Sequence, residues 1–520
     1  MKKVNNQSAL MRFMGGVERI GNKLPHPFYL FALLAILAVV LSVIFNGASV
    51  TYEVASSSGD AATTATATVK NLLNRDTIGY VITSLYKIYF NFSPMMMIGL
   101  LTLTIGLCEQ VGLFDAVIRK TILGAKPALI FAIVSFIAFQ SNMASSAGIL
   151  GCTTVAASLF ASLGYNPWLG IILAYAAGNA GMFANVFPGQ MDVLLVGVTQ
   201  SVCASLGLDG TSAHVLMNWF FMLPCAVVLT VVYTLITTKF TSRFMGPPKD
   251  LSLIKIEPQE KAENTNESRA LRKTAIATVL FFVVLIVACI PKNSFLRSAD
   301  GTLFPASPLM SGILTLMFLF FLVVGLVFGR AVGKIPTWNT LPKLFANSIG
   351  TLANFMVIAL PASLFIYLFN ESGIPTVLGV TGAQFLKSSG INGFGLLICI
   401  ALFSTFLNLF MTSGISKWMI LAPILIPMFY AIGFSPALTT MAYRIGDAST
   451  NAIAPISTDI ALILALLTKY NTDKDKTPGI GTVMAGCLPY AVATFVIGLL
   501  ILAVFWILKL PLGPGSPLFV

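Results

Sequence analysis

Charged residues are scarce in this 520-residue sequence. They make up 10% of the chain, whereas soluble domains carry about 25%. Histidine occurs only as His26 and His214, which argues against a histidine-based zinc site or nucleophile. The seven cysteines are scattered without a CxxC pair and are interpreted as small buried hydrophobic residues. The sequence holds no Walker lysine motif and no GxSxG, so an ATP-driven pump and a hydrolase are both disfavoured.

Hydrophobic residues are correspondingly abundant in the sequence. They form 57% of the chain, and the mean hydropathy is +0.88. Several apolar runs reach about 20 residues, the length that crosses a bilayer core roughly 30 Å thick. The first run, at 27–46, lacks an A-x-A cleavage site and is interpreted as a retained helix. The composition therefore predicts one all-α polytopic membrane domain. The net charge of +12 does not indicate nucleic acid, because the basic residues lie in short segments between apolar runs.

We predict about nine transmembrane helices and two re-entrant hairpins. Each hairpin has two apolar arms, too short for a comfortable crossing, around a small polar tip at 142–148 or 411–417. Non-helical backbone at membrane depth is tolerated only where protein or water satisfies it. The spans are expected at about 27–46, 93–112, 167 onward (interrupted at 184–192), 213–238, 274–290, 309–329, 346–370, 436 onward and 482–508.

The loop charges set the expected orientation. Five Lys/Arg precede residue 26, and the linker 239–273 holds eight Lys/Arg against five Asp/Glu. With the N-terminus in the cytoplasm, the basic segments 113–126, 330–343 and 469–476 also fall inside, as the positive-inside rule requires. The count works only if the first hairpin enters from the inside and the second from the outside, which is the arrangement of an inverted repeat.

The repeat is visible in the residues that follow each hairpin. Gly164-Tyr165-Asn166-Pro167 after the first hairpin corresponds to Gly433-Phe434-Ser435-Pro436 after the second. Chance similarity between glycine-rich helices is the alternative, but ordered matches across three segments favour duplication. Further matches are Ala174-Tyr175 with Ala442-Tyr443, Gly178-Asn179 with Gly446-Asp447, and Asn185, Pro188 and Asp192 with Asn451, Pro455 and Asp459.

The repeat divides the chain into six segments. They are an N-terminal segment with the first span and a polar loop (1–91), the first repeat (92–238), a cytoplasmic linker (239–273), a two-span scaffold (274–344), the second repeat (345–510) and a C-terminal tail (511–520).

The hairpin tips are the expected cation site. Carbonyl groups at the end of the first arm suit a cation, and the N-terminal end of the second arm favours an anion. In the second half, Asn408 and Thr412 share a helix face, and Asp447 offers a carboxylate to Na⁺ or carries a proton. In the first half the matching residues are uncharged, and they are Asn142, Ser145, Ser146 and Asn179. No cofactor is expected beyond Na⁺ as a candidate coupling ion.

The expected substrate site lies beside the second tip. A charge at mid-membrane costs at least about 2.5 kcal/mol and is usually functional and paired. Arg444 and Asp447 are three residues apart on one helix face, so they form either a structural ion pair or a site in which Arg444 holds a substrate carboxylate. Ser413 and Ser416 add hydroxyl groups.

Three nearby residues have alternative interpretations. Trp418 either stacks on an aromatic substrate or only packs, and Asp192 either joins the site or caps a helix. Lys417 is expected to snorkel toward the interface. We expect the second half to bear most of the binding, with Asp192 as the main contribution from the first.

The chain resembles the aminobenzoyl-glutamate transporter (AbgT) family over nearly its whole length, within the wider ion-transporter superfamily. The resembling stretches are GVERIGNKLPHPF at 16–28, MDVLLVGVT at 191–199, SGISKWMILAPILIPMF at 413–429 and GFSP…YRIGD within 433–447. The resemblance implies nine transmembrane helices with two re-entrant hairpins, a bowl-shaped homodimer and an elevator-type movement of the hairpin-bearing domain in a bacterial inner membrane. It also implies import of p-aminobenzoyl-glutamate, or export of p-aminobenzoate and sulfonamides, in folate metabolism.

By the same resemblance, the substrate residues fall on Asp192, Trp418, Pro436, Arg444 and Asp447, with Asn408 and Asp447 near a cation. The chain departs from the family pattern in three places. Ser146 stands where an acidic residue is common, Ile415 stands where serine is frequent, and a ProPro pair is absent from the second arm of the first hairpin.

Two other functions remain open from the sequence. A carrier of dicarboxylates or short-chain fatty acids would use the same fold, and loss of Trp418 would then not affect ligands without a ring. A membrane enzyme is disfavoured because no histidine, cysteine or paired-carboxylate constellation is present, and an open channel is disfavoured by the short hairpin arms.

Overall fold

The protein is described from a computed structural model that covers residues 25–54, 63–124, 126, 129–254, 265–304, 307–388, 390, 393–455 and 457–520. The side chains of 52–54, 63–65, 144–147, 265, 387 and 458 lie outside this description. The basic N-terminal residues before 25, which set the predicted orientation, and residues 255–264 of the predicted linker also lie outside the described residues.

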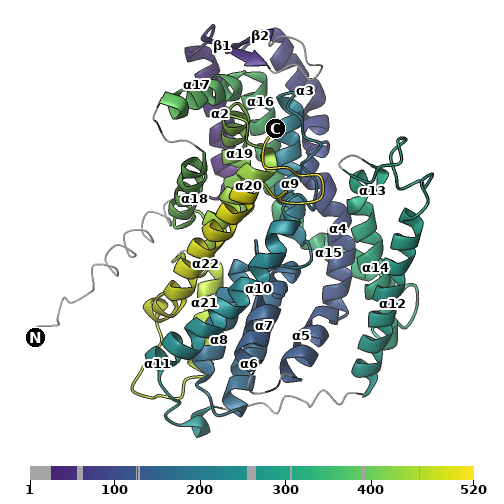
Figure 1. Cartoon of the computed structure of the whole chain (residues 1–520), viewed down its shortest axis with the longest axis vertical. Helices are drawn as coiled ribbons and strands as arrows, with labels where there is room; N and C mark the ends of the chain where they lie inside the picture. Colours follow the sequence, from purple (N-terminus) through teal and green to yellow (C-terminus); the bar gives the residue numbers. More distant parts are fainter. Residues whose placement is uncertain are drawn as a thin grey trace, which may run out of the picture.

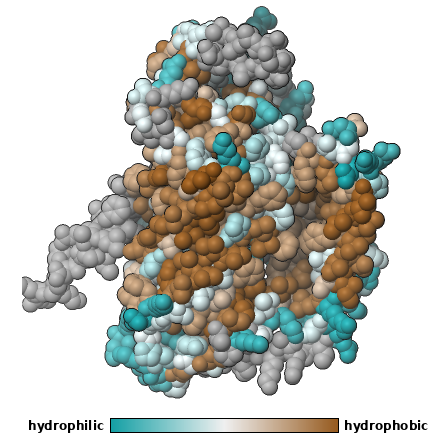
Figure 2. All heavy atoms as spheres, in the orientation of Figure 1, coloured by the Kyte–Doolittle hydropathy of each residue, from teal (hydrophilic) through white to brown (hydrophobic). Residues whose placement is uncertain are grey.

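A belt of apolar helices is typical of a multi-pass membrane protein. Figure 2 shows a hydrophobic band across the middle of the molecule, with hydrophilic residues gathered toward both ends. Among the described residues, seven helical stretches are long and apolar enough to cross a membrane. They are Pro27–Ile44 (α2), Arg75–Gln110 (α3 and α4), Trp219–Met245 (α10 and its extension), Asn266–Cys289 (in α12), Ile313–Ala331 (α14), Ala353–Glu371 (α16) and Ile480–Leu508 (α22).

The order of helices repeats along the chain (Figure 1). The first series is α3 (Arg75–Phe90), α4 (Ser93–Gln110), α5 (Leu113–Leu123), α6 (Ile130–Ser141), α7 (Ser145–Ser162), α8 (Pro167–Ala180), α9 (Gln190–Ser205) and α10 (Trp219–Ile236). The second is α15 (Thr340–Gly350), α16 (Ala353–Glu371), α17 (Ile374–Ser388), α18 (Phe394–Asn408), α19 (Gly414–Tyr430), α20 (Pro436–Thr450), α21 (Thr458–Lys469) and α22 (Ile480–Leu508). Short arms therefore occur in pairs, α6 with α7 and α18 with α19, at the positions of the two predicted hairpins.

The residues matched between the two repeats occupy equivalent structural positions in both series. Pro167 and Pro436 each occupy the first turn of a helix, where the missing N–H and the fixed φ are tolerated. Gly164 (φ +77°) and Gly433 (φ +91°) both adopt the left-handed backbone conformation that glycine adopts without steric cost. The repeat read from the sequence thus marks the start of α8 and α20.

The elements outside the repeat are short or flank it. They are α2 (Pro27–Ile44), β1 (Ser49–Val54), β2 (Thr63–Thr68), η3 (Thr237–Thr241), α11 (Ser242–Met245), η4 (Leu251–Leu253), α12 (Thr265–Cys289), α13 (Pro308–Ser311) and α14 (Ile313–Ala331). In Figure 1, α12 and α14 stand at one side of the molecule. The antiparallel pair of β1 and β2 replaces part of the loop predicted at 47–91. Its TTATAT run alternates with the period of a strand, a signal that the sequence interpretation passed over.

Some helices do not coincide with the predicted spans. The helix that contains the span predicted from 274 begins at Thr265, because the charged first turns of α12 extend the helix beyond its apolar run. The span predicted from 346 is two helices, since the chain turns at Thr351 and Leu352 between α15 and α16. Hydropathy detects only the apolar part of a helix, so it misses helical turns that continue into polar sequence.

The C-terminal tail is a strap that holds both halves near the start of α20. His214 Nε2 lies 2.6 Å from the Pro514 carbonyl oxygen. This oxygen only accepts, so Nε2 carries the proton, and burial lowers the pKa of the imidazole. Beyond it, the Ser435 backbone N–H donates to the Leu518 carbonyl at 2.9 Å, and the Val520 N–H donates to that of Gly433 at 3.0 Å. The strap therefore joins the segment before α10 to the cap of α20.

Helix α20 is buried along its whole length and packs closely on α18. A Cβ added at Gly446 would lie 2.1 Å from the Ala401 carbonyl oxygen and 2.7 Å from Ser404 Cβ. Only glycine permits this approach, which brings the end of α20 against α18.

Replacing Gly446 with alanine is expected to destabilise the protein by about 1–3 kcal/mol, the usual cost of overpacking a close-packed interior. Thermal denaturation in detergent measures the change. Gly99→Ala is the matched control, because a Cβ at this helical glycine meets nothing within 4 Å. Equal melting temperatures for the two variants would show that α18 and α20 separate readily.

Candidate functional site

A cavity of about 390 Å³ lies where the two pairs of short arms meet. One wall comes from the turn between α6 and α7 and the broken segment between α8 and α9. The other comes from the turn between α18 and α19 and the broken segment between α20 and α21. Its lining residues are Asn142, Ile149, Asn179, Met182, Gln190, Met191, Leu194, Thr412, Ser413, Gly414, Ile415, Asp447, Asn451, Ser457 and Asp459. Both halves contribute, and both carboxylates come from the second.

The turn before α19 is shaped by its N-cap. Helix α18 ends at Asn408 and α19 begins at Gly414. Ser413 has extended backbone, and its Oγ accepts from the Ser416 N–H at 3.3 Å, as serine does at helix N-caps. No acidic residue lies in the first turn of α19 itself, so the positive end of the helix dipole lies at the cavity wall beside Ser413 and Gly414. Asp447 is close to it, since a Cβ added at Gly414 would lie 2.8 Å from Asp447 Oδ2.

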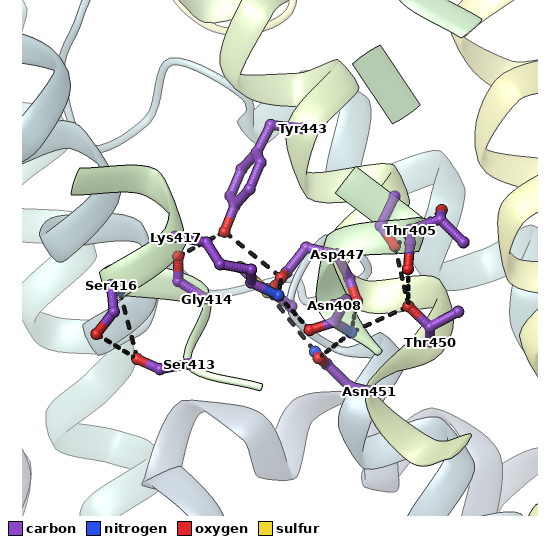
Figure 3. Close-up of polar contacts among 12 residues, drawn as sticks. Thr405, Asn408, Ser413, Gly414, Ser416, Lys417, Tyr443, Asp447, Thr450 and Asn451 are labelled. Carbon is purple, nitrogen blue, oxygen red and sulfur yellow. Dashed lines mark hydrogen bonds and ion pairs between the residues drawn. The ribbon is translucent and has the colours of Figure 1, made fainter. Parts of the chain in front are cut away.

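A buried ion pair joins α19 to α20 next to the cavity. The Lys417 ammonium contacts Asp447 Oδ1 and also donates to Asn408 Oδ1. Figure 3 shows these three side chains pointing toward one another. Lys417 is 1% exposed and Asp447 is fully buried. The prediction that Lys417 snorkels to the interface is therefore wrong, because its charge has a partner inside the protein.

A second buried ion pair joins the two halves of the chain. Arg444 Nη2 lies 2.7 Å from Asp192 Oδ1, with both side chains nearly inaccessible, and Arg444 also donates to the Met182 carbonyl oxygen. Asp192 Oδ2 accepts from the Gly189 N–H at 2.7 Å, so Asp192 caps α9 as well as pairing with Arg444. Of the two alternatives for Arg444 and Asp447, the structural ion pair between them does not form, because each of these charges has a partner on another helix.

Trp418 is packed inside the protein rather than on the cavity wall. Its ring lies 4.7 Å from that of Tyr443, centroid to centroid, and its Nε1 donates to Thr199 Oγ1 at 3.1 Å. The side chain is fully buried. The structure shows these packing contacts, and stacking of Trp418 on an aromatic substrate stays a prediction.

The structure brings most of the predicted residues together, in two layers. Asn142, Asn179, Thr412, Ser413 and Asp447 line the cavity. Asn408, Ser416, Trp418, Arg444 and Asp192 are buried behind them and are not part of its lining.

The structure does not place two of the predicted residues, Pro436 and Ser146, at the cavity. Pro436 begins α20, eleven residues before Asp447, which is about 16 Å along a helix axis. The side chain of Ser146 lies outside the described residues. Their roles as ligands stay predictions.

The sequence interpretation missed the role of Lys417. The same rule that singled out Arg444, a charge at membrane depth, applied equally to Lys417. It also gave no role to Asn451 or Asp459, although both were matched between the repeats and both line the cavity. Position within the repeat was the signal that would have found them.

A second cavity of about 580 Å³ lies between α5, α7, α12 and α14. It is lined by charged side chains that include Asp115, Lys334 and the ion pair of Arg119 with Glu267, whose atoms lie 3.0 Å apart. It contains none of the predicted site residues.

Comparisons with known proteins agree on one family. The model of the AbgT putative transporter family matches residues 12–520. The p-aminobenzoyl-glutamate transport protein of Escherichia coli (strain K12) is 33% identical over 517 residues, which cover 99% of this chain and 98% of that protein.

Two solved structures have the same fold. Neisseria gonorrhoeae MtrF, described as illuminating a class of antimetabolite efflux pumps, superposes with a TM-score of 0.89 at 30% identity, covering 97% of this chain and 100% of MtrF. The Alcanivorax borkumensis YdaH transporter, described as having an unusual topology, superposes with a TM-score of 0.84 at 27% identity, covering 94% of this chain and 100% of YdaH.

Proposed function

We propose that this chain, which belongs to the AbgT family of membrane transporters, is a secondary transporter of p-aminobenzoyl-glutamate, p-aminobenzoate and related aromatic carboxylates. A Na⁺ or proton gradient drives it. The observation that carries this proposal is the cavity between the two pairs of short arms, because it is formed by chain breaks from both repeats. Sites at the interface of two repeats, built from discontinuous helices, are typical of secondary transporters.

The chemistry of the cavity suits an aromatic acid. Its volume of about 390 Å³ falls in the range of about 300–1,000 Å³ typical of small-molecule sites. Ile149, Leu194 and Ile415 offer apolar surface for a ring. The N-terminus of α19, with the Ser413 hydroxyl beside it, offers a carboxylate the positive end of a helix dipole.

We propose nine spans and two re-entrant hairpins, arranged as an inverted repeat with the N-terminus in the cytoplasm. Seven of the spans are the long apolar stretches. The other two are proposed to be the broken units, α8 with α9 and α20 with α21. Helix α6, with 12 residues, and α18, with 15, are about 18 and 22 Å long, short of a bilayer core of roughly 30 Å. Their lengths support arms that enter and leave on one side.

The assembly is proposed to be a homodimer in the bacterial inner membrane, with the hairpin-bearing elements moving against a scaffold. The position of α12 and α14 at one side of the molecule supports a scaffold role (Figure 1). Only 11% of the apolar window of α12 is buried within the chain, which leaves most of that helix to face lipid or a second copy.

Flux of labelled substrate into proteoliposomes tests the proposed function. The purified protein is expected to move p-aminobenzoyl-glutamate or p-aminobenzoate when a Na⁺ or a proton gradient is imposed. Protein-free liposomes and liposomes with a dissipated gradient are the controls. Absence of flux under both gradients, with folded protein in the bilayer, would refute the proposal. Flux restricted to acids without a ring would favour the carrier of other small carboxylates.

Replacing Ser413 with alanine is expected to destabilise the protein by about 1 kcal/mol through loss of an N-cap, and also to raise the KM for substrate. Ser435→Ala is the matched control, because Ser435 caps α20 through the Leu438 N–H at 3.2 Å and does not line the cavity. If the two variants have similar melting temperatures and only Ser413→Ala has a raised KM, the substrate binds at the start of α19. A KM unchanged from wild type would remove Ser413 from the site.

A further inference from the structure

The Lys417 ammonium lies where the sequence predicts a coupling cation. The expected cation ligands in the second half were Asn408, Thr412 and Asp447. In the structure, Lys417 reaches from the first turn of α19 to Asn408 Oδ1 at the end of α18 and to Asp447 Oδ1 on α20 (Figure 3). One side chain thus binds the oxygens of two other helices, as a small cation bound there would.

The hydrogen bonds of Asn408 fix which of its amide atoms faces this place. Its Nδ2 donates to the Asp447 carbonyl oxygen at 2.8 Å, to Thr450 Oγ1 at 3.0 Å and to Asn451 Oδ1 at 2.8 Å. These acceptors surround the nitrogen, so the amide oxygen points to the ammonium. These bonds do not involve Lys417. The Asn408 amide oxygen is therefore oriented to bind a cation, whether that cation is the Lys417 ammonium or a metal ion.

A sodium ion does not fit beside this ammonium. Hard cations such as Na⁺ take oxygen ligands, and two of the three ligands predicted in the second half, Asn408 and Asp447, already face the Lys417 charge. A second positive charge at this distance would be repelled in a site of low dielectric constant. Lys417 also neutralises Asp447, which removes the attraction that would draw Na⁺ into the protein.

Other charged and polar groups lie near the pair of Lys417 with Asp447. On α20, Arg444 pairs with Asp192 of α9, and the Tyr443 hydroxyl donates to the Gly414 carbonyl oxygen and lies 3.4 Å from Asp447 Oδ1. Asp459 lies on the cavity wall. Helix α17 packs on the far part of α19, where Gly379 and Gly382 meet Pro427 and Met428.

We propose that the Lys417 ammonium is a built-in cation of the transport site and occupies the place between Asn408 and Asp447 that Na⁺ was expected to take. Transport by this chain then draws on a proton gradient and not on a Na⁺ gradient. This consequence rests on the proposed transport function, whereas the exclusion of Na⁺ from the site does not.

Thermal denaturation with and without Na⁺ tests the exclusion directly. Binding to the folded state raises the melting temperature as ligand concentration rises. The wild-type protein is expected to melt at the same temperature in NaCl and in choline chloride of equal concentration. Lys417→Gln removes the ammonium and leaves the oxygens of Asp447 and Asn408 without a cation between them. The melting temperature of this variant is therefore expected to rise with Na⁺ concentration.

Matched variants separate a local site from a general salt effect. Lys239→Gln makes the same substitution at an exposed lysine and should show no response to Na⁺. The double variant Lys417→Gln/Asp447→Asn lacks both charges and should lose the response that Lys417→Gln gains. If Lys417→Gln does not fold in choline, purification in Na⁺ followed by removal of Na⁺ should unfold it, while the double variant stays folded.

Two results would overturn the inference. One is a wild-type melting temperature that rises with Na⁺ but not with choline. The other is a Lys417→Gln variant that responds to Na⁺ no more than Lys239→Gln does. Proteoliposome flux then tests the consequence: the wild type should respond to an imposed proton gradient and not to a Na⁺ gradient. Absence of all flux alongside the predicted Na⁺ responses would refute the proposed function and leave the built-in cation intact.

Discussion

Replacing Arg444 with leucine is expected to lower the stability of the folded protein by about 3–5 kcal/mol and to abolish transport, because it leaves the Asp192 carboxylate buried without a counter-charge. Asp192 and Arg444 are both nearly inaccessible, and their charged atoms lie 2.7 Å apart. The pair joins α9 of the first repeat to α20 of the second, so its loss also loosens the contact between halves. Thermal denaturation in detergent and substrate flux measure the two effects.

The double variant Asp192→Asn/Arg444→Leu separates stability from function. Removing both charges relieves the unpaired carboxylate, so the double variant should be more stable than Arg444→Leu while remaining inactive. Arg119→Leu is the control, because Arg119 pairs with Glu267 and the two side chains are 42% and 24% exposed. This substitution should lower the stability of the folded protein by only about 0–1 kcal/mol. Equal destabilisation by Arg444→Leu and Arg119→Leu would contradict a buried role for the pair.

Replacing Asp447 with asparagine is expected to destabilise the protein by a similar amount, about 3–5 kcal/mol, because it strands the Lys417 ammonium in the interior. The substitution keeps the shape of the side chain and removes its charge. It also alters the cavity wall, since Asp447 lines the cavity and its Oδ2 is buried without a hydrogen-bond partner among the described residues. Transport should therefore be lost together with stability, measured by flux and by melting temperature.

The second-site change Lys417→Gln should restore much of the stability of Asp447→Asn, since both charges are then absent. Added Na⁺ should not stabilise Asp447→Asn, in contrast to Lys417→Gln, because the stranded charge is positive. Asp473→Asn, which breaks the partly exposed pair of Asp473 with Lys249, is the control and should lower stability only slightly. If Lys417→Gln failed to raise the melting temperature of Asp447→Asn, the two residues would not be coupled.

Residue patterns alone identified the class of protein and the chain segments that line the cavity between the two halves. Apolar runs predicted the membrane domain, and the tips at 142–148 and 411–417 fall at the two turns that meet at the cavity. These features are local, since a run of apolar residues or a serine before a helix acts through its immediate neighbours. The family assignment made from four sequence stretches is confirmed by the match over residues 12–520.

Only the tertiary structure decided which charges are partners. Spacing along one helix allowed a pair of Arg444 with Asp447 as one of two alternatives, yet Arg444 meets Asp192 and Asp447 meets Lys417. A buried charge needs an opposite charge within a few ångströms, and several helices offer one. Which of them is close enough depends on how the helices pack, through contacts such as that of Gly446 with Ala401. Composition and spacing therefore identified charges at membrane depth, and the packing of α9, α19 and α20 determined which of them form pairs.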